Sequence, residues 1–165
     1  PEGKTLHIVF FAYQTSYTPP KKGCGNVIHC DDNVGVIIAP VRASYTQTWW
    51  TNDESTINYE FAQDFKNWAE FSDRIYVWPY SINFYAYLYP FASHDTMIKD
   101  YRFFRENHGV LMMNEGNWED MEVTGFGRLK DYIETKAMRD VNVNYNDIVT
   151  KYFKYNFWSK RNNSK

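Results

Sequence analysis

Four apolar runs of β type alternate with amphipathic segments of helical period, and this alternation constrains the fold more than any other feature. The strands are expected at Thr5–Ala12, Val34–Val41, Ile75–Trp78 and Val110–Met113. The first two are almost continuously apolar, which is typical of parallel strands covered on both faces. The order strand, loop, strand, helix, strand, helix, strand, helix, helix predicts an α/β architecture with a parallel sheet.

The helices are expected at Glu54–Phe71, Ser93–Asn107, Gly125–Met138 and about Tyr145–Phe157. Each carries apolar residues at spacings of three and four, which gives one buried stripe. Candidate N-caps are Asn52 or Asp53, then Ser93, then Asn144. Residues 1–158 are expected to form one domain, and 159–165 a frayed tail.

The loops that follow the strands are long and aromatic, whereas the connections from helix back to strand are short. That asymmetry fits a (β/α)8 barrel of the TIM type, whose ligand site lies at the carboxyl ends of the strands. The four strand–helix units are about half of a (β/α)8 barrel, which typically needs about 250 residues, and we expect them to be the later half. A doubly wound open sheet is the rival, but no glycine-rich phosphate loop follows any strand.

The net charge of −2 gives no general attraction to nucleic acid or to an anionic membrane. No apolar run is long enough to span a bilayer. We therefore expect no nucleic-acid or membrane partner, and no motif calls for a cofactor or metal. Cys24 and Cys30 suit either a disulfide or free thiols. The start at Pro1 leads us to expect a mature, processed or excised piece.

Aromatic residues make up 19% of the chain and are dense in Ile75–Phe91. Such side chains either pack under neighbouring loops or form a wall for a ligand with flat apolar faces, such as a sugar. We favour the wall, and Trp78, Tyr80 and Tyr85 are the candidates to stack on sugar rings.

Glu115 is the candidate catalytic carboxylate, since it follows the last expected strand, between Asn114 and Gly116. Asn114 and Trp118, just beyond, are candidate substrate-binding residues. Glycoside hydrolysis needs two carboxyl groups, and no partner for Glu115 stands out. The alternative role for Glu115 is a hydrogen bond to sugar hydroxyls or to an arginine. Arg42 could clamp a sugar carboxylate, or pair with an acid at the barrel mouth.

Five blocks of the sequence together resemble the carboxyl-terminal half of the bacterial domain-of-unknown-function family numbered 4838. In chain order, the blocks are FAYQTSYTPP, NVGVIIAPVRASY, NWAEFSDRIYVWPYSINFYAYLYPF, DYRFFRENHGVLMMNEGNW and FGRLKDYIETKAM. Members look like glycoside-hydrolase-type barrels, distantly similar to α-glucuronidases and β-hexosaminidases. The resemblance implies a ligand-facing set at Tyr13-Gln14, Trp78–Tyr80, Asn83 and Glu115-Gly116. From the residues alone, Tyr13 and Gln14 could donate to sugar hydroxyls or simply pack in their loop.

The sequence thus predicts a glycoside hydrolase domain that acts on a polysaccharide or oligosaccharide by carboxylate acid–base chemistry. The expected partners are carbohydrate and the missing amino-terminal half of the barrel, and the expected location is periplasmic or extracellular. The alternative is a non-catalytic carbohydrate-binding or scaffold barrel fragment.

Overall fold

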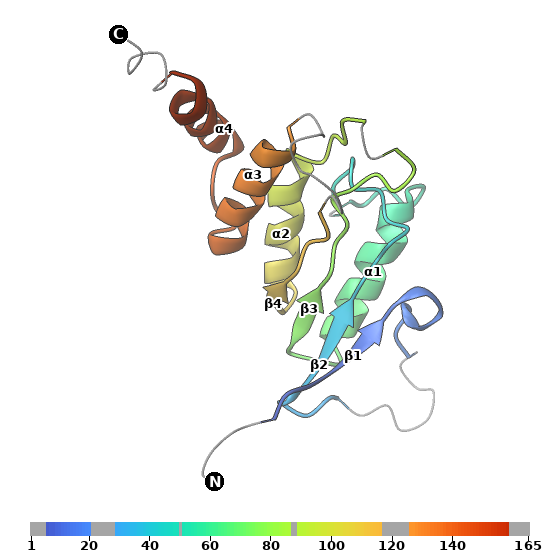
Figure 1. Ribbon diagram of the computed structural model, residues 1–165. Coiled ribbons are helices and arrows are strands. Elements are labelled where there is room, and N and C mark those ends of the chain that lie inside the picture. Colours follow the sequence, from blue (N-terminus) through green and yellow to red (C-terminus); the bar gives the residue numbers. More distant parts are fainter. Residues whose placement is uncertain (1–5, 21–28, 50, 87–88, 117–125, 159–165) are drawn as a thin grey trace.

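The computed structural model describes residues 6–20, 29–49, 51–86, 89–116 and 126–158. Its sheet consists of β1 (Ile8–Ala12), β2 (Val34–Ile38), β3 (Ile75–Val77) and β4 (Gly109–Met112). The four strands are parallel and lie side by side in sequence order (Figure 1). The predicted α/β architecture with a parallel sheet is therefore confirmed.

The helices are α1 (Ile57–Ala69), α2 (Thr96–Glu106), α3 (Gly127–Arg139) and α4 (Tyr145–Phe153). A short 3-10 turn, η1 (Gln14–Ser16), follows β1, and a π-helical turn, η2 (Lys154–Trp158), extends α4. Helix α3 packs on α2, and α4 packs on α3, so that the last helix lies away from the sheet (Figure 1). The predicted tail 159–165 lies outside the described residues.

Helices α1 and α2 lie on the same face of the sheet. Each connects two neighbouring parallel strands, and right-handed crossovers in one direction place their helices on one side. Phe65 of α1 stacks on Phe104 of α2 with ring centroids 5.2 Å apart. Trp49, from the loop before α1, packs edge-on against Phe104 at 5.2 Å and is fully buried. This aromatic layer fills the space between the sheet and the helices.

The opposite face of the sheet is open. Side chains alternate along a strand, so the strand register places Val9, Phe11, Ile37, Tyr76 and Leu111 together on the side away from α1 and α2. Phe11 is 50% exposed and Leu111 is 57% exposed. Tyr76 lies against Gly35 of β2, where a Cβ atom would come within 2.5 Å of the tyrosine ring. We call this apolar surface the open face.

The expectation that the first strand is covered on both faces is wrong for this structure. Its residues from Ile8 to Phe11 are all exposed, between 39% and 53%. The reason is that β1 is an edge strand, and the described residues between β1 and β2 form no α-helix that could cover it. Phe10 packs edge-on against the Trp68 ring of α1, with ring centroids 5.8 Å apart.

Two of the predicted helix starts are also wrong. Helix α1 is capped by Thr56, whose side chain accepts a hydrogen bond from the Tyr59 amide, while Asp53 instead caps a turn at Ser55. Helix α2 begins after Asp95, because Ser93 and the next two residues form a turn ahead of it. The predicted cap at Asn144 is confirmed, since its side chain accepts from the Asp147 amide at 3.2 Å.

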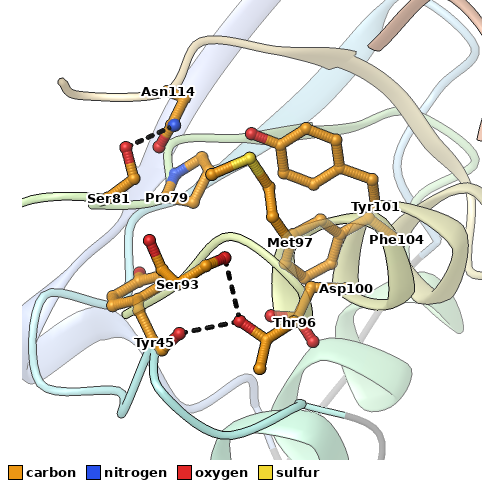
Figure 2. A pocket seen from close by; sticks show the side chains of 10 residues that line it. All are labelled: Tyr45, Pro79, Ser81, Ser93, Thr96, Met97, Asp100, Tyr101, Phe104 and Asn114. Atoms are coloured by element: carbon orange, nitrogen blue, oxygen red, sulfur yellow. Dashed lines mark hydrogen bonds between the residues drawn. The ribbon is translucent and has the colours of Figure 1, made fainter. Parts of the chain in front are cut away.

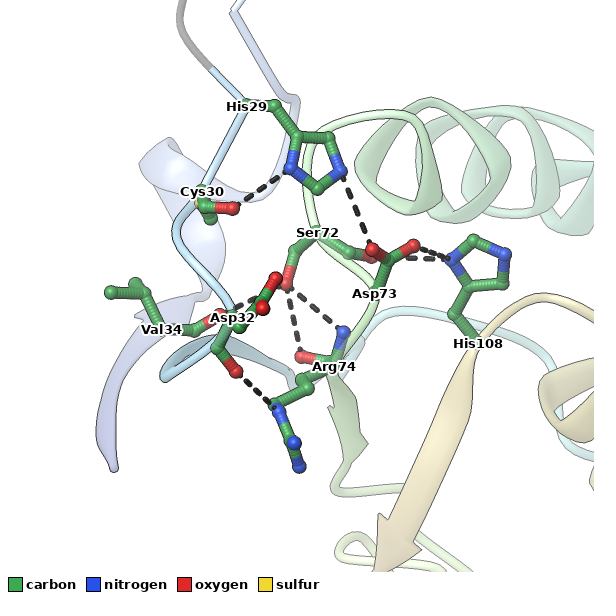
Figure 3. A network of polar contacts seen from close by, with 8 residues as sticks. All are labelled: His29, Cys30, Asp32, Val34, Ser72, Asp73, Arg74 and His108. Atoms are coloured by element: carbon green, nitrogen blue, oxygen red, sulfur yellow. Dashed lines mark hydrogen bonds and ion pairs between the residues drawn. The ribbon is translucent and has the colours of Figure 1, made fainter. Parts of the chain in front are cut away.

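The amino ends of the strands are joined by polar contacts from three separate segments (Figure 3). Asp73, between α1 and β3, pairs with His108 at 3.2 Å and lies 3.9 Å from His29. The Arg74 side chain donates to the Asp32 carbonyl at 2.6 Å. These contacts fix the register at this end, while the opposite end of the sheet carries longer loops. No helix in the described part of the chain is both long and apolar enough to cross a membrane.

Candidate functional site

The carboxyl ends of β1, β3 and β4 bring four of the predicted residues together. Tyr13 follows β1, Trp78 and Tyr80 follow β3, and Glu115 follows β4. Each continues the alternation that places Phe11, Tyr76 and Leu111 on the open face. We call Tyr13, Trp78, Tyr80 and Glu115 the rim site.

The centre of the rim site is a hydrogen bond from Trp78 Nε1 to Glu115 Oε2, with a length of 2.9 Å. The Trp78 ring also packs against Phe11 of β1, with centroids 5.9 Å apart. An indole N–H only donates and a carboxylate only accepts, so this pairing is chemically matched. Within the described residues, Glu115 Oε1 accepts no hydrogen bond.

The backbone of Glu115 is held by an extension of the β3–β4 ladder. The Glu115 amide donates to the Pro79 carbonyl at 2.8 Å, and the Ser81 amide donates to the Glu115 carbonyl at 3.0 Å. These two bonds form an isolated parallel bridge between Tyr80 and Glu115. The carboxylate is therefore attached to paired backbone, which positions a functional group better than a free loop does.

Tyr80 is the buried member of the rim site. Burial raises the pKa of its hydroxyl to about 12, and Tyr13 and Glu115 add to the rise. Tyr80 is consequently a neutral hydrogen-bond donor at physiological pH. Its ring packs edge-on against Tyr45 and Phe84, with centroids 6.4 Å and 5.7 Å away. It serves as the floor of the site, whereas Tyr13 and Trp78 are only half-buried.

The other predicted ligand residues are not drawn into the rim site. Arg42 is exposed and has no hydrogen bond or ion pair with any described residue. Asn83 uses its side-chain oxygen to accept from the Tyr85 amide at 3.1 Å, and Tyr85 is fully exposed. Gln14 is exposed in a left-handed turn with φ of 49°. Trp118 lies outside the described residues.

The structure adds three buried polar residues next to the rim site that the sequence analysis missed. Ser81, Lys130 and Glu134 are each less than 10% exposed. Ser81 Oγ donates to Glu134 Oε1 at 2.8 Å and accepts from Asn114 Nδ2 at 2.7 Å. The signal that could have revealed Glu134 is its place in α3, between the buried Ile133 and Ala137, where the stripe calls for an apolar residue.

A small cavity of about 10 Å³ lies between Ser81 and Asn114 on one side and residues of α2 on the other (Figure 2). The polar residues that line it include Ser81, Ser93, Asp100, Tyr101 and Asn114. Its size matches about one water molecule, so it is too small for a sugar. Burial raises the pKa of Asp100 to about 8, although the Trp49 amide donates to this carboxyl at 2.7 Å. Asp100 belongs to the core beneath the rim site, not to a ligand surface.

No group of three or more His, Cys, Asp or Glu side chains in the described ranges is arranged to hold a metal ion. Cys30 is a free thiol, and Cys24 lies outside the described residues.

Comparison with known proteins identifies a family but no characterised relative. The model of the family described as Domain of unknown function (DUF4838) matches residues 4–160. No curated protein and no solved structure matches the chain. The family description names no activity, so the function has to be argued from the rim site.

Proposed function

The chain belongs to the DUF4838 family, and on that premise we propose that its rim site binds carbohydrate. The observation that carries the proposal is the Trp78–Glu115 hydrogen bond at the carboxyl ends of parallel strands. It places a half-buried aromatic ring beside a carboxylate oxygen with no other described partner. A sugar ring presents an apolar face and a set of hydroxyls, and these two groups complement both features.

We further propose that the site belongs to a glycoside hydrolase of the barrel type, in which Glu115 supplies one of the two carboxyl groups. Glu115 accepts from the Trp78 indole, which suits the carboxylate that acts as base or nucleophile better than the protonated acid. Such an enzyme would meet polysaccharides in the periplasm or outside the cell, and we propose that location.

The open face supports a partner for this chain. A parallel sheet is normally covered on both faces, yet Val9, Phe11 and Leu111 are each at least 42% exposed. Both edge strands, β1 and β4, also lack a neighbour on one side among the described residues. We propose that the remaining half of a (β/α)8 barrel covers this face and contributes the second carboxyl group.

One observation favours the second candidate, a non-catalytic carbohydrate-binding domain. Among the four residues that directly follow each strand, Glu115 is the single acid: the sequences are YQTS, APVR, WPYS and MNEG. A hydrolase needs a second carboxyl group within about 5–10 Å. Sugar binding without turnover by the complete protein would identify this second candidate.

The test is an oligosaccharide screen followed by titration of the best ligand. Trp78→Ala is expected to weaken binding about tenfold or more, which corresponds to about 1.4 kcal/mol. Glu115→Gln is expected to preserve most of the affinity and to abolish hydrolysis by the complete protein. Glu106→Gln is the matched control, since Glu106 is exposed at the end of α2, next to the amino end of β4. Unchanged affinity in Trp78→Ala would refute the site.

A further inference from the structure

Ser81 connects the rim site to helix α3 through every one of its polar groups. Its amide donates to the Glu115 carbonyl at 3.0 Å, and its carbonyl accepts from Lys130 Nζ. Its hydroxyl accepts from Asn114 at 2.7 Å and donates to Glu134 at 2.8 Å. Ser81 is thus the last rung of the extended β3–β4 ladder and also the contact between that ladder and α3.

Lys130 and Glu134 are placed to act together on Ser81. They lie four residues apart on α3, so their side chains project from the same side of the helix. Lys130 also lies over the Phe91 ring, 5.2 Å from its centroid. Two charged groups this deeply buried are costly unless each is paired. Since apolar residues of similar volume often replace a buried polar pair without loss of stability, helix packing alone does not require Lys130 and Glu134.

We propose that Glu134 is a positioning residue for Glu115, acting through the Ser81 hydroxyl to fix the end of β4 against β3. This inference rests on the proposed function of the rim site and deepens it. In this role, the Glu134–Ser81–Asn114 chain holds the residue that precedes Glu115, while the Ser81 amide holds Glu115 itself. The orientation of the carboxylate toward Trp78 then depends on α3.

The electrostatics give this arrangement a measurable signature. Burial raises the pKa of Glu134 to about 7, while the Ser81 hydrogen bond and Lys130 oppose the rise. The charged groups that face Glu134 are Lys130 and Asp131 on α3, and Tyr101 on α2 also faces it. His94 faces Lys130. The Ser81–Glu134 bond is charge-assisted above pH 7 and becomes a weaker neutral bond below it.

The test is the indole N–H resonance of Trp78 in the ligand-free protein, followed by NMR between pH 5.5 and 8.5. We expect the resonance to shift with a midpoint near pH 7, because the Glu115 acceptor moves when Glu134 titrates. Glu134→Gln keeps an acceptor for Ser81 but cannot ionise, so this transition should be lost. Trp68 is the internal control: its indole donates to the Tyr17 carbonyl at 2.6 Å, and its ring packs against Phe10 of β1.

Each outcome decides the inference. A Trp78 resonance that does not shift near pH 7 in the wild-type protein would overturn it, as would a midpoint that persists in Glu134→Gln. Ser81→Ala provides a second variant, in which Glu134 still titrates but Trp78 should no longer respond. Because no sugar is present, a positive NMR result with no oligosaccharide binding would refute the proposed function and leave the positioning role intact.

Discussion

Replacing Asp100 with asparagine should make the protein more stable, and increasingly so as the pH rises. Asp100 lies in α2, is 4% exposed, and accepts a hydrogen bond from the Trp49 amide. Burial raises its pKa from 3.8 to about 8. The folded protein therefore keeps this carboxyl protonated at neutral pH, whereas the unfolded chain releases the proton. Asparagine keeps the oxygen that accepts from Trp49 and has no proton to release.

The size of the effect follows from proton linkage. Because the pKa of Asp100 is raised on folding, its contribution to stability is complete below pH 3.8 and is lost as the pH rises toward 8. Each pH unit inside that interval costs about 1.4 kcal/mol. Between pH 5 and pH 8, the free energy of unfolding of the variant should rise relative to the wild type by about 4 kcal/mol.

The assay is urea denaturation followed by tryptophan fluorescence at pH 5 and at pH 8. Glu134 also has a raised pKa, so both proteins lose stability with pH, and only their difference reports on Asp100. Asp147→Asn is the matched control, since Asp147 is exposed in the first turn of α4. If wild type and Asp100→Asn showed the same pH dependence, the carboxyl would not be protonated in the fold and the reasoning would fail.

Three further substitutions test other parts of the structure by denaturation. Asn58→Ala should lower the free energy of unfolding by about 2–4 kcal/mol. The fully buried Asn58 side chain accepts from the Ser44 amide and donates to carbonyls of the loop that carries Trp49. A loss below about 1 kcal/mol would contradict this expectation. Thr56→Ala should lower the free energy of unfolding by about 1 kcal/mol, because it removes the N-cap hydrogen bond of α1, and it should leave ligand binding unchanged. A double-mutant cycle of Trp78→Phe and Glu115→Ala, each of which removes one partner of the hydrogen bond, should give a coupling of about 1.5 kcal/mol, and additive effects would show that the bond is not formed in solution.

Strand-end reasoning found the centre of the rim site but not its extent. Trp78 and Glu115 come directly after paired strands, so the alternation of side chains fixes the face on which they lie. Arg42 and Tyr85 lie in irregular loops, where no such period applies. The direction of each of these side chains depends on the path of its loop. Both side chains are exposed and have no described contact with the rim site.

The sequence by itself determined the order and type of the elements, because the strand and helix periods are local and depend on neighbouring residues only. It also predicted one buried stripe for each helix, and in α2 that stripe contains Met97, Ile98, Tyr101 and Phe104, which are all buried. Tertiary structure alone decided which apolar strands stay exposed, since that depends on whether another segment covers them. It also decided that Glu134 meets Ser81, 53 residues away, because this buried carboxyl reaches the loop after β3 only when α3 packs on α2.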